Sequence, residues 1–407
     1  MQAVALSFFV SGKIGKSGVR RAELSKIELI ATATFGLEAV VKREIENMGY
    51  RVLRSEDAKI TYLADERGIV RSNLRLRCAD RVLVKIGEFD VPTSEDLFQQ
   101  TKALPWEEWI PPDGRFTVNC TTVKSVLRSE PACQKTVKKA IVDRLAEYYA
   151  MESFPETGAP YTVKVTILKD RATLTIDTSG AGLHKRGYRV KTVEAPIKET
   201  LAAALVQLSF WNASRLLIDP FCGSGTIAVE AAMYMRNIAP GLGREFASQR
   251  WDCIPQELWK EEKKAAYEAI DYDREIRILA SDIDRRAVAA ARENAEEAGV
   301  EDCISFSVKP FEKLHIGEPY AVIIGNPPYG ERIGDKKKLK NIYVRLKEML
   351  KRDKTLSAYI ITADRSLEEE LMPRQPDRRR KLYNGRIETC FYQYYGERPP
   401  KRSETSL

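Results

Sequence analysis

The stretch of the chain best suited to chemistry is Asn326-Pro327-Pro328-Tyr329, which directly follows the short apolar run 322–325. The run has the length of a buried central strand, and two consecutive prolines exclude both a helix and further strand pairing after it. Ligands of open α/β sheets bind just beyond the carboxyl ends of the strands, so the four residues should stand where a substrate arrives. The alternative is a tight turn without chemical meaning.

Asn326 and Pro327 together offer two hydrogen-bond acceptors, the amide side-chain oxygen and the main-chain carbonyl. An amino group on an aromatic base is a poor nucleophile because its lone pair is delocalised into the ring. Two acceptors could bind its two hydrogens and favour a pyramidal nitrogen, while Tyr329 offers an aromatic face to a flipped or splayed base. We therefore predict catalytic roles for Asn326, Pro327, Pro328 and Tyr329, with positioning rather than a strong base supplying most of the catalysis.

A glycine-rich turn, Asp219-Pro-Phe-Cys-Gly-Ser-Gly-Thr226, follows another apolar strand and opens a helix. Glycine lets the backbone approach a ligand closely, and the helix amino end offers unpaired N–H groups. Alone this pattern could serve a dinucleotide, but position 228 is alanine and Asp219 would repel a pyrophosphate. An amino-acid ammonium or a sulfonium nucleoside fits better. The predicted cofactor contacts here are Asp219, Phe221, Gly223, Gly225 and Thr226.

The next expected strand of this region is 276–280, and the acidic residue Asp282 follows it directly after Ser281. A carboxylate at that place typically binds ribose hydroxyls, so Asp282 and its neighbour Ile283 are predicted cofactor contacts. Asp284 has a competing structural explanation, because an Asp just before a helix makes a good cap.

Regular alternation of strands and helices surrounds these motifs and predicts a mostly parallel sheet covered on both faces. An insertion at 237–275 contains a helix, and Asn384-Gly385 predicts a terminal antiparallel hairpin at the edge of the sheet. The expected strands are 215–219, 276–280, 304–307, 321–325 and 357–362, and the expected helices are 198–205, 226–234, 285–298 and 340–350.

Two small α+β units precede this region. The first has expected strands at 27–31, 51–55, 59–64 and 69–76 and a helix at 35–48. The second has helices at 94–103 and 132–150 and strands at 115–121, 161–168 and 171–178.

Basic side chains gather in two places before the glycine-rich turn. One cluster surrounds the start of the helix at 132–150, and the other lies in the glycine-broken segment 179–191. Such groups can contact phosphates, and an aromatic among them can stack on a base. A solvated face and a plain domain linker are the respective alternatives. The candidate RNA contacts are Lys124, Arg128, Lys135, Lys138, Lys139, Lys185, Arg186, Tyr188 and Arg189.

Composition narrows the classes of protein. The 66 basic and 58 acidic residues give a net charge of +8, which suits an anionic partner without demanding one. Seven scattered cysteines indicate a reduced, cytoplasmic compartment, and two distant histidines argue against a metal site or a Ser-His-Asp hydrolase. No early apolar run is long enough to predict a membrane span.

The glycine-rich turn combined with Asn326-Pro-Pro-Tyr resembles the class I S-adenosylmethionine-dependent methyltransferases that act on amino groups. Leu183-His-Lys-Arg-Gly-Tyr-Arg189 and Tyr383-Asn-Gly-Arg-Ile-Glu388 narrow the resemblance. Together they are similar to the THUMP-containing family related to bacterial 23S rRNA guanine-N2 methyltransferases, whose members are often called N6-adenine-specific DNA methylases.

That resemblance implies a Rossmann-like methyltransferase domain, with a mostly parallel sheet, preceded by ferredoxin-like and THUMP domains. It also implies S-adenosylmethionine as cofactor, and Thr200 as a further contact to it. Relatives commonly carry an acid after the third strand for the cofactor adenine, whereas 307–311 has none, so Glu312 or backbone would substitute. The expected division is a flexible tail at 1–25, the ferredoxin-like domain at 26–92, THUMP at 93–180, a basic linker at 181–197, the methyltransferase domain at 198–395 and a tail at 396–407.

Three functions follow from these expectations. The first is methylation of guanine N2 in RNA, most simply 23S rRNA. The second is methylation of adenine N6 in DNA, because the Asn-Pro-Pro-Tyr motif recognises an amine rather than a particular base. The third is an RNA-binding ribosome assembly factor that has the fold without turnover.

Overall fold

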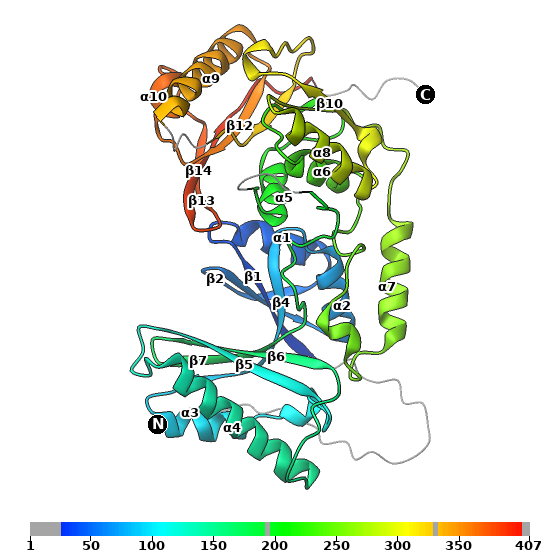
Figure 1. Ribbon diagram of the computed structural model, residues 1–407, viewed down its shortest axis with the longest axis vertical. Coiled ribbons are helices and arrows are strands. Elements are labelled where there is room, and N and C mark those ends of the chain that lie inside the picture. Colours follow the sequence, from blue (N-terminus) through cyan, green and yellow to red (C-terminus); the bar gives the residue numbers. More distant parts are fainter. Residues whose placement is uncertain (1–25, 192–195, 329–332, 401–407) are drawn as a thin grey trace.

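The computed structural model describes residues 26–191, 196–328 and 333–400, with the side chains of 333–336 excepted. Two seven-stranded sheets organise it, one built by the front of the chain and one by the rest. Figure 1 shows the second sheet and its helices above the first.

The front sheet has the strand order β2-β3-β1-β4-β7-β6-β5. Its long central strand β4 pairs with β1 at Val84↔Leu29 and with β7 at Asp90↔Arg171, both antiparallel. The two small units expected from the sequence therefore share one continuous sheet. Its elements are β1 Ile27–Ala33, α1 Glu38–Asn47, β2 Arg51–Glu56, β3 Lys59–Ala64, α2 Glu66–Arg75, β4 Ala79–Asp90, α3 Ser94–Lys102, β5 Arg115–Val123, α4 Glu130–Tyr149, β6 Pro160–Leu168 and β7 Arg171–Asp177.

The segment 69–76, expected as a strand, is mostly helix α2. Its amino end is capped by Asp65, whose side chain accepts the backbone N–H of Gly68 at 2.7 Å. Ile69, Val70 and Leu74 are fully buried against the sheet. The β-branched pair suggested a strand, but burial of one helical face and the cap decided otherwise.

The second sheet has the order β10-β9-β8-β11-β12-β14-β13. The first five strands run parallel, and β14 and β13 close the edge as the expected antiparallel hairpin. The elements are α5 Glu199–Leu208, β8 Leu217–Asp219, α6 Thr226–Met235, α7 Gln256–Glu268, β9 Ile278–Asp282, α8 Arg285–Glu297, β10 Ile304–Val308, β11 Val322–Gly325, α9 Ile333–Arg352, β12 Ser357–Thr362, α10 Ser366–Leu371, β13 Arg378–Asn384 and β14 Ile387–Tyr394.

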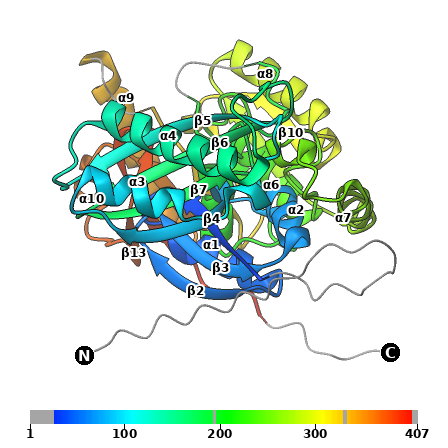
Figure 2. The same cartoon turned by 90° about the horizontal axis from the view of Figure 1, so that it is seen from below.

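Contacts between the two halves come from segments far apart in sequence. Helix α7 of the insertion lies beside α2, where Glu262 accepts hydrogen bonds from Arg67 at 3.0 Å and from Arg71 at 2.8 Å. The terminal hairpin reaches the front sheet, with the Phe35 and Tyr383 rings edge to face at 6.2 Å. Seen from below, α3 and α4 lie on the outer face of the front sheet (Figure 2). Within the described ranges, no helix has both the length and the apolarity to cross a membrane.

Candidate active site

The Asn-Pro-Pro motif stands at the end of β11, between β8 and β12 in the middle of the second sheet. All four residues of β11 are buried, whereas Asn326 is partly exposed at the sheet edge. The Asn326 side-chain oxygen is shielded from solvent and has no hydrogen-bond partner among the residues that the structure describes. Because buried acceptors are almost always paired, this oxygen is available to a donor from outside the chain. Tyr329, the fourth predicted catalytic residue, lies outside the described residues.

Asp219 ends β8 and is fully buried. One carboxylate oxygen accepts the Phe221 N–H at 3.4 Å, and the other has no partner in the described part of the chain. Burial raises the pKa of Asp219 to about 8. A buried carboxylate oxygen without a donor suits a cationic ammonium, so the residues present fit the amino-acid end of S-adenosylmethionine.

The glycine-rich turn has the backbone geometry that glycine permits. Gly225 has a φ of +84°, and a Cβ there would lie 2.9 Å from the Cβ of Ala291 on α8. Any other residue would clash as well as be strained. The turn therefore brings the start of α6 into close contact with α8.

Asp282 at the end of β9 connects this turn to its own strand. One carboxylate oxygen accepts the Gly223 N–H at 3.0 Å, and the other accepts the Asp284 N–H at 2.9 Å. Asp284 accepts the Arg286 N–H and caps α8, which confirms the structural explanation for this residue. Ile283 is 75% exposed. Asp282 is thus fixed at the carboxyl edge of the sheet, beside the turn.

Phe221 joins the glycine-rich turn to the Asn-Pro-Pro motif. A Cβ on Gly325, the residue before Asn326, would lie 3.0 Å from the Phe221 ring. The Phe221 ring also packs against the ring of Phe311, with 5.1 Å between the two centroids. Sequence reasoning missed the roles of Gly325 and Phe311, and a glycine at the very end of a buried strand was the available signal.

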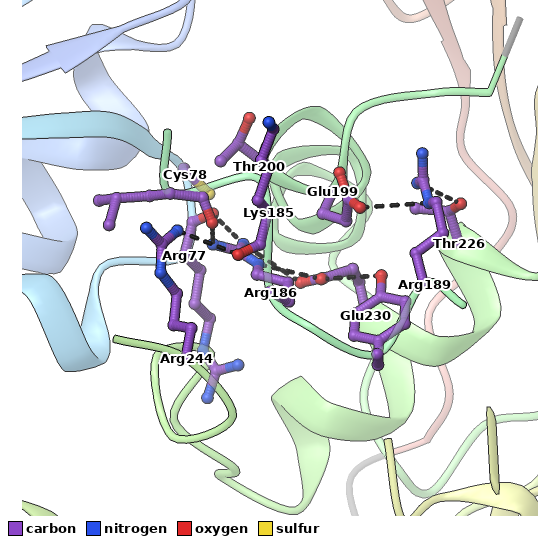
Figure 3. A network of polar contacts seen from close by, with 12 residues as sticks. Arg77, Cys78, Lys185, Arg186, Arg189, Glu199, Thr200, Thr226, Glu230 and Arg244 are labelled. Carbon is purple, nitrogen blue, oxygen red and sulfur yellow. Dashed lines mark hydrogen bonds and ion pairs between the residues drawn. The ribbon is translucent and has the colours of Figure 1, made fainter. Parts of the chain in front are cut away.

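The segment 181–191 is not a free linker. Arg186 and Tyr188, both predicted to contact RNA, are buried in it. Arg186 and Tyr188 are only 3% and 5% exposed. The Arg186 guanidinium lies 3.2 Å from the Glu230 carboxylate on α6, and the Tyr188 hydroxyl donates to the same carboxylate at 3.1 Å (Figure 3). Arg186 also donates to the carbonyls of Leu183 and Arg77, the latter before β4. Arg186 therefore bridges the two halves of the protein, and neither buried side chain is placed to reach RNA.

Arg189 is mostly buried and bonded to the site. Its guanidinium donates to the Thr226 hydroxyl and to the Ile197 carbonyl, both at 2.8 Å, and lies 3.2 Å from Glu199 (Figure 3). Thr226 begins α6, directly after Gly225. Arg189 therefore fixes the start of α6, where several predicted cofactor contacts lie. Because its guanidinium is bonded there, Arg189 is not placed to contact RNA.

Asn294 on α8, which sequence reasoning missed, completes this arrangement. Its amide donates to the carbonyls of Ser224 and Lys191, both at 3.0 Å, and its oxygen accepts the N–H groups of Val190 and Lys191 at 3.0 and 3.2 Å. All its hydrogen-bonding capacity is used, and it is fully buried. It ties the glycine-rich turn to the 189–191 backbone.

Thr200 is fully buried near the start of α5, and its hydroxyl donates to Asp80 of β4 at 3.2 Å. The partner belongs to the front sheet. The structure therefore places the Thr200 hydroxyl at the contact between the two halves, and the cofactor contact of Thr200 stays a prediction.

The remaining basic candidates are exposed: Lys124, Arg128, Lys135, Lys138, Lys139 and Lys185. Lys124 and Arg128 line a surface cavity of about 520 Å³ between the end of β5 and the β6–β7 turn. Lys138 and Lys139 lie over the rings of Phe116 and Phe98 at 5.7 and 5.6 Å from the centroids. In the part of the chain that the structure describes, no group of three or more metal-ligating side chains is found.

A parallel sheet with a glycine-rich turn after one central strand and Asn-Pro-Pro after the neighbouring one defines a class I methyltransferase, the class whose methyl donor is S-adenosylmethionine. Family comparison agrees. Residues 186–393 match the RMKL-like methyltransferase domain, residues 28–83 the RlmL ferredoxin-like domain and residues 92–177 the THUMP domain. The chain belongs to this family of THUMP-containing methyltransferases.

Individual relatives cover nearly the whole chain. YpsC of Bacillus subtilis, provisionally named an RNA methyltransferase, is 46% identical over 384 residues, which are 94% of this chain and 99% of YpsC. A Listeria monocytogenes protein described as a predicted N6-adenine-specific DNA methylase is 45% identical with a TM-score of 0.87, covering 92% of this chain and 97% of that one. SMU.472, provisionally named a methyltransferase and solved with SAH, is 40% identical with a TM-score of 0.87, covering 92% and 99%.

Proposed function

We propose that the protein transfers a methyl group from S-adenosylmethionine to the exocyclic N2 amine of a guanine in RNA, with 23S rRNA as the substrate. The observation that carries this proposal is the buried Asn326 oxygen at the end of β11, which has no partner within the described ranges. It lies one strand from the glycine-rich turn, and Phe221 packs the two together.

When bound, S-adenosylmethionine supplies an electrophilic methyl carbon on a sulfonium. Asp219 would offer its second carboxylate oxygen to the donor ammonium, and Asp282 would accept hydrogen bonds from the ribose hydroxyls. Asn326 and the Pro327 carbonyl accept the two hydrogens of the target amine and direct its lone pair at the methyl carbon. The new N–C bond forms as the S–C bond breaks, leaving a neutral thioether, and the amine proton then passes to solvent. These residues supply orientation, which is the larger part of such a rate enhancement.

An RNA substrate is supported by the THUMP match and by the name of YpsC. The exposed cations support it as well, because none of them has a carboxylate ion-pair partner among the described residues. We propose Lys124, Arg128, Lys135, Lys138, Lys139 and Lys185 as phosphate contacts.

Mass spectrometry of ribosomal RNA from cells lacking the gene tests the proposal. An N2-methylguanosine should disappear and return with the wild-type gene, but not with Asn326→Ala. The variant protein should still bind S-adenosylhomocysteine in calorimetry, because Asn326 faces the target amine. If every N2-methylguanosine persists in the deletion strain, the guanine assignment is wrong. Absence of donor binding by the wild type, with RNA binding retained, would instead support an assembly factor.

Methylation of adenine N6 in DNA is the second candidate, supported by the description of the Listeria relative and by a motif that selects an amine rather than a base. Purified enzyme with tritiated S-adenosylmethionine should label ribosomal RNA from the deletion strain and leave duplex DNA unlabelled. The reverse result would select the DNA reaction.

A further inference from the structure

Three exposed or half-exposed arginines meet where the front of the chain touches the edge of the second sheet. Arg43 lies on α1 of the front sheet, and Arg378 and Arg380 lie on β13, the edge strand. Two residues apart on a strand, Arg378 and Arg380 point to the same face. None of the three has a carboxylate ion-pair partner in the described part of the chain, and the Arg380 Nε is buried without any hydrogen-bond partner. The three guanidinium groups are therefore unneutralised.

The strand that carries Arg378 and Arg380 packs against the residues just before α1, the helix of Arg43, because a Cβ at Gly36 would lie only 2.7 Å from the Lys381 carbonyl oxygen. Burial lowers the pKa of Arg380, and the positive charges of Arg378 and Arg43 lower it further. Asp377, the acid next to Arg378 in sequence, accepts the Tyr395 N–H at 2.7 Å and lies 3.6 Å from Arg374, so it is already engaged. Uncompensated like charges at a junction between domains are unfavourable unless an anion binds there.

Aromatic rings border the same place. Phe210, after α5, is 61% exposed and has a φ of +57°, in the left-handed region that a bulky residue rarely adopts. The centroid of its ring lies 6.0 Å from that of Tyr395. Tyr395 stands two residues after Gln393, which pairs with Arg378 across the two strands. The Tyr395 hydroxyl donates to the Gln393 side-chain oxygen at 2.7 Å, so its ring lies on the face of the sheet that Arg378 shares. Phe210 is exposed and Tyr395 is half-buried. Aromatic rings beside arginines without ion-pair partners are the combination that binds single-stranded nucleic acid.

We propose that this junction patch, made of Arg43, Phe210, Arg378, Arg380 and Tyr395, binds a single-stranded segment of the RNA substrate. The arginines contact phosphates and Phe210 stacks on a base. The proposal rests on the proposed function in taking RNA as the substrate, and it adds a contact region built jointly by α1 and β13. A second copy of the chain fits less well, because arginines on an edge strand repel their own copies and discourage strand pairing.

The double variant Arg378→Gln/Arg380→Gln tests the phosphate contacts. Its affinity for a fluorescent 15-nucleotide oligouridylate, measured by anisotropy over a range of salt concentrations, should fall about tenfold, and the salt slope should decrease by about 1.4, or 0.7 for each lost phosphate contact. Arg365→Gln/Arg379→Gln is the matched control. It removes the same charge from arginines that lie 3.2 Å from Glu388 and 2.7 Å from Glu368, respectively. The control should bind within about twofold of the wild type.

Phe210→Leu tests the stacking contact, because it keeps an apolar side chain and removes the ring. Affinity should fall about fivefold or more with an unchanged salt slope. Equal loss in the arginine variant and its control would show a general charge effect and overturn the proposal, as would unchanged RNA affinity. Light scattering that shows a wild-type dimer and a monomeric double variant would overturn it in favour of a second copy.

Donor binding separates this proposal from the proposed function. All the variants should bind S-adenosylhomocysteine as the wild type does, since none touches the glycine-rich turn. If guanine N2 methylation fails in cells while the double variant still loses RNA affinity selectively, the patch stands and the reaction is wrong. If methylation is found and the double variant binds oligouridylate normally, only the patch is wrong.

Discussion

The basic cluster of the THUMP unit and the basic segment 185–189 look alike in sequence, but the structure uses their arginines differently. Arg186 and Arg189 are bonded within the fold, whereas Lys185 is exposed like the THUMP cations. Lys135 and Lys138 are exposed on α4 without ion-pair partners among the described residues, whereas Arg186 is buried against Glu230. The difference comes from the neighbouring helix α6, which presents a buried carboxylate to one cluster only. A run of cations therefore does not show by itself whether its charges serve a partner or the fold.

The largest expected effect comes from Arg186→Met, which leaves the Glu230 carboxylate buried without its ion pair. The free energy of unfolding should fall by about 3–5 kcal/mol, because an unpaired buried charge is strongly unfavourable. Denaturant unfolding of the full chain measures it. Lys185→Met, one residue earlier and exposed, is the control and should change stability by less than about 0.5 kcal/mol. If both variants are equally stable and both lose RNA affinity, the distinction between the two clusters is wrong.

The second prediction concerns the pH dependence of stability that the buried Asp219 carboxyl should produce. Its folded pKa of about 8 lies above the unfolded value near 3.8, so the folded protein holds the extra proton between these values. The wild type should therefore lose unfolding free energy as pH rises from about 4 to 8, by up to several kcal/mol. Asp219→Asn resembles the protonated acid and should remove that part of the slope. Parallel pH profiles for the two proteins would mean that Asp219 is ionised throughout.

Asn294→Ala tests the connection between the 189–191 backbone and the glycine-rich turn. Loss of its hydrogen bonds should cost about 1–3 kcal/mol and weaken S-adenosylhomocysteine binding about tenfold in calorimetry. The neighbouring Glu293→Gln is the matched control, because Glu293 is partly exposed and, among the described residues, forms an ion pair with Lys191 alone. Donor binding equal to the wild type in Asn294→Ala, with lowered stability, would restrict Asn294 to a structural role.

The smallest effect is expected from single charges of the exposed cluster. Lys135→Gln should weaken RNA binding a fewfold and reduce the salt slope by about 0.7–0.9, with stability unchanged. Anisotropy titrations over a range of salt measure both. A salt slope equal to that of the wild type would assign Lys135 to a solvated face.

Much of the fold followed from local patterns. Alternating strands and helices predicted the parallel sheet, and Asn384-Gly385 predicted the edge hairpin, which the structure confirms. The failure at 69–76 came from Ile69-Val70, a β-branched pair whose helical state depends on burial against the sheet. The sharing of β4 by both front units also escaped prediction, since strand pairing between units leaves no local pattern.

The sequence by itself determined where the candidate site lies along the chain. Strand ends, glycines with positive φ and consecutive prolines act within a few residues, so Asp219, Gly225 and Asn326 could be singled out from the letters alone. Tertiary structure decided what depends on a partner distant in sequence. It buried Arg186 and Tyr188 against Glu230, bonded Arg189 to Thr226, and packed Phe221 against Gly325. Burial and hydrogen bonding depend on which residues are neighbours in space, so they cannot be read from the type of a single residue.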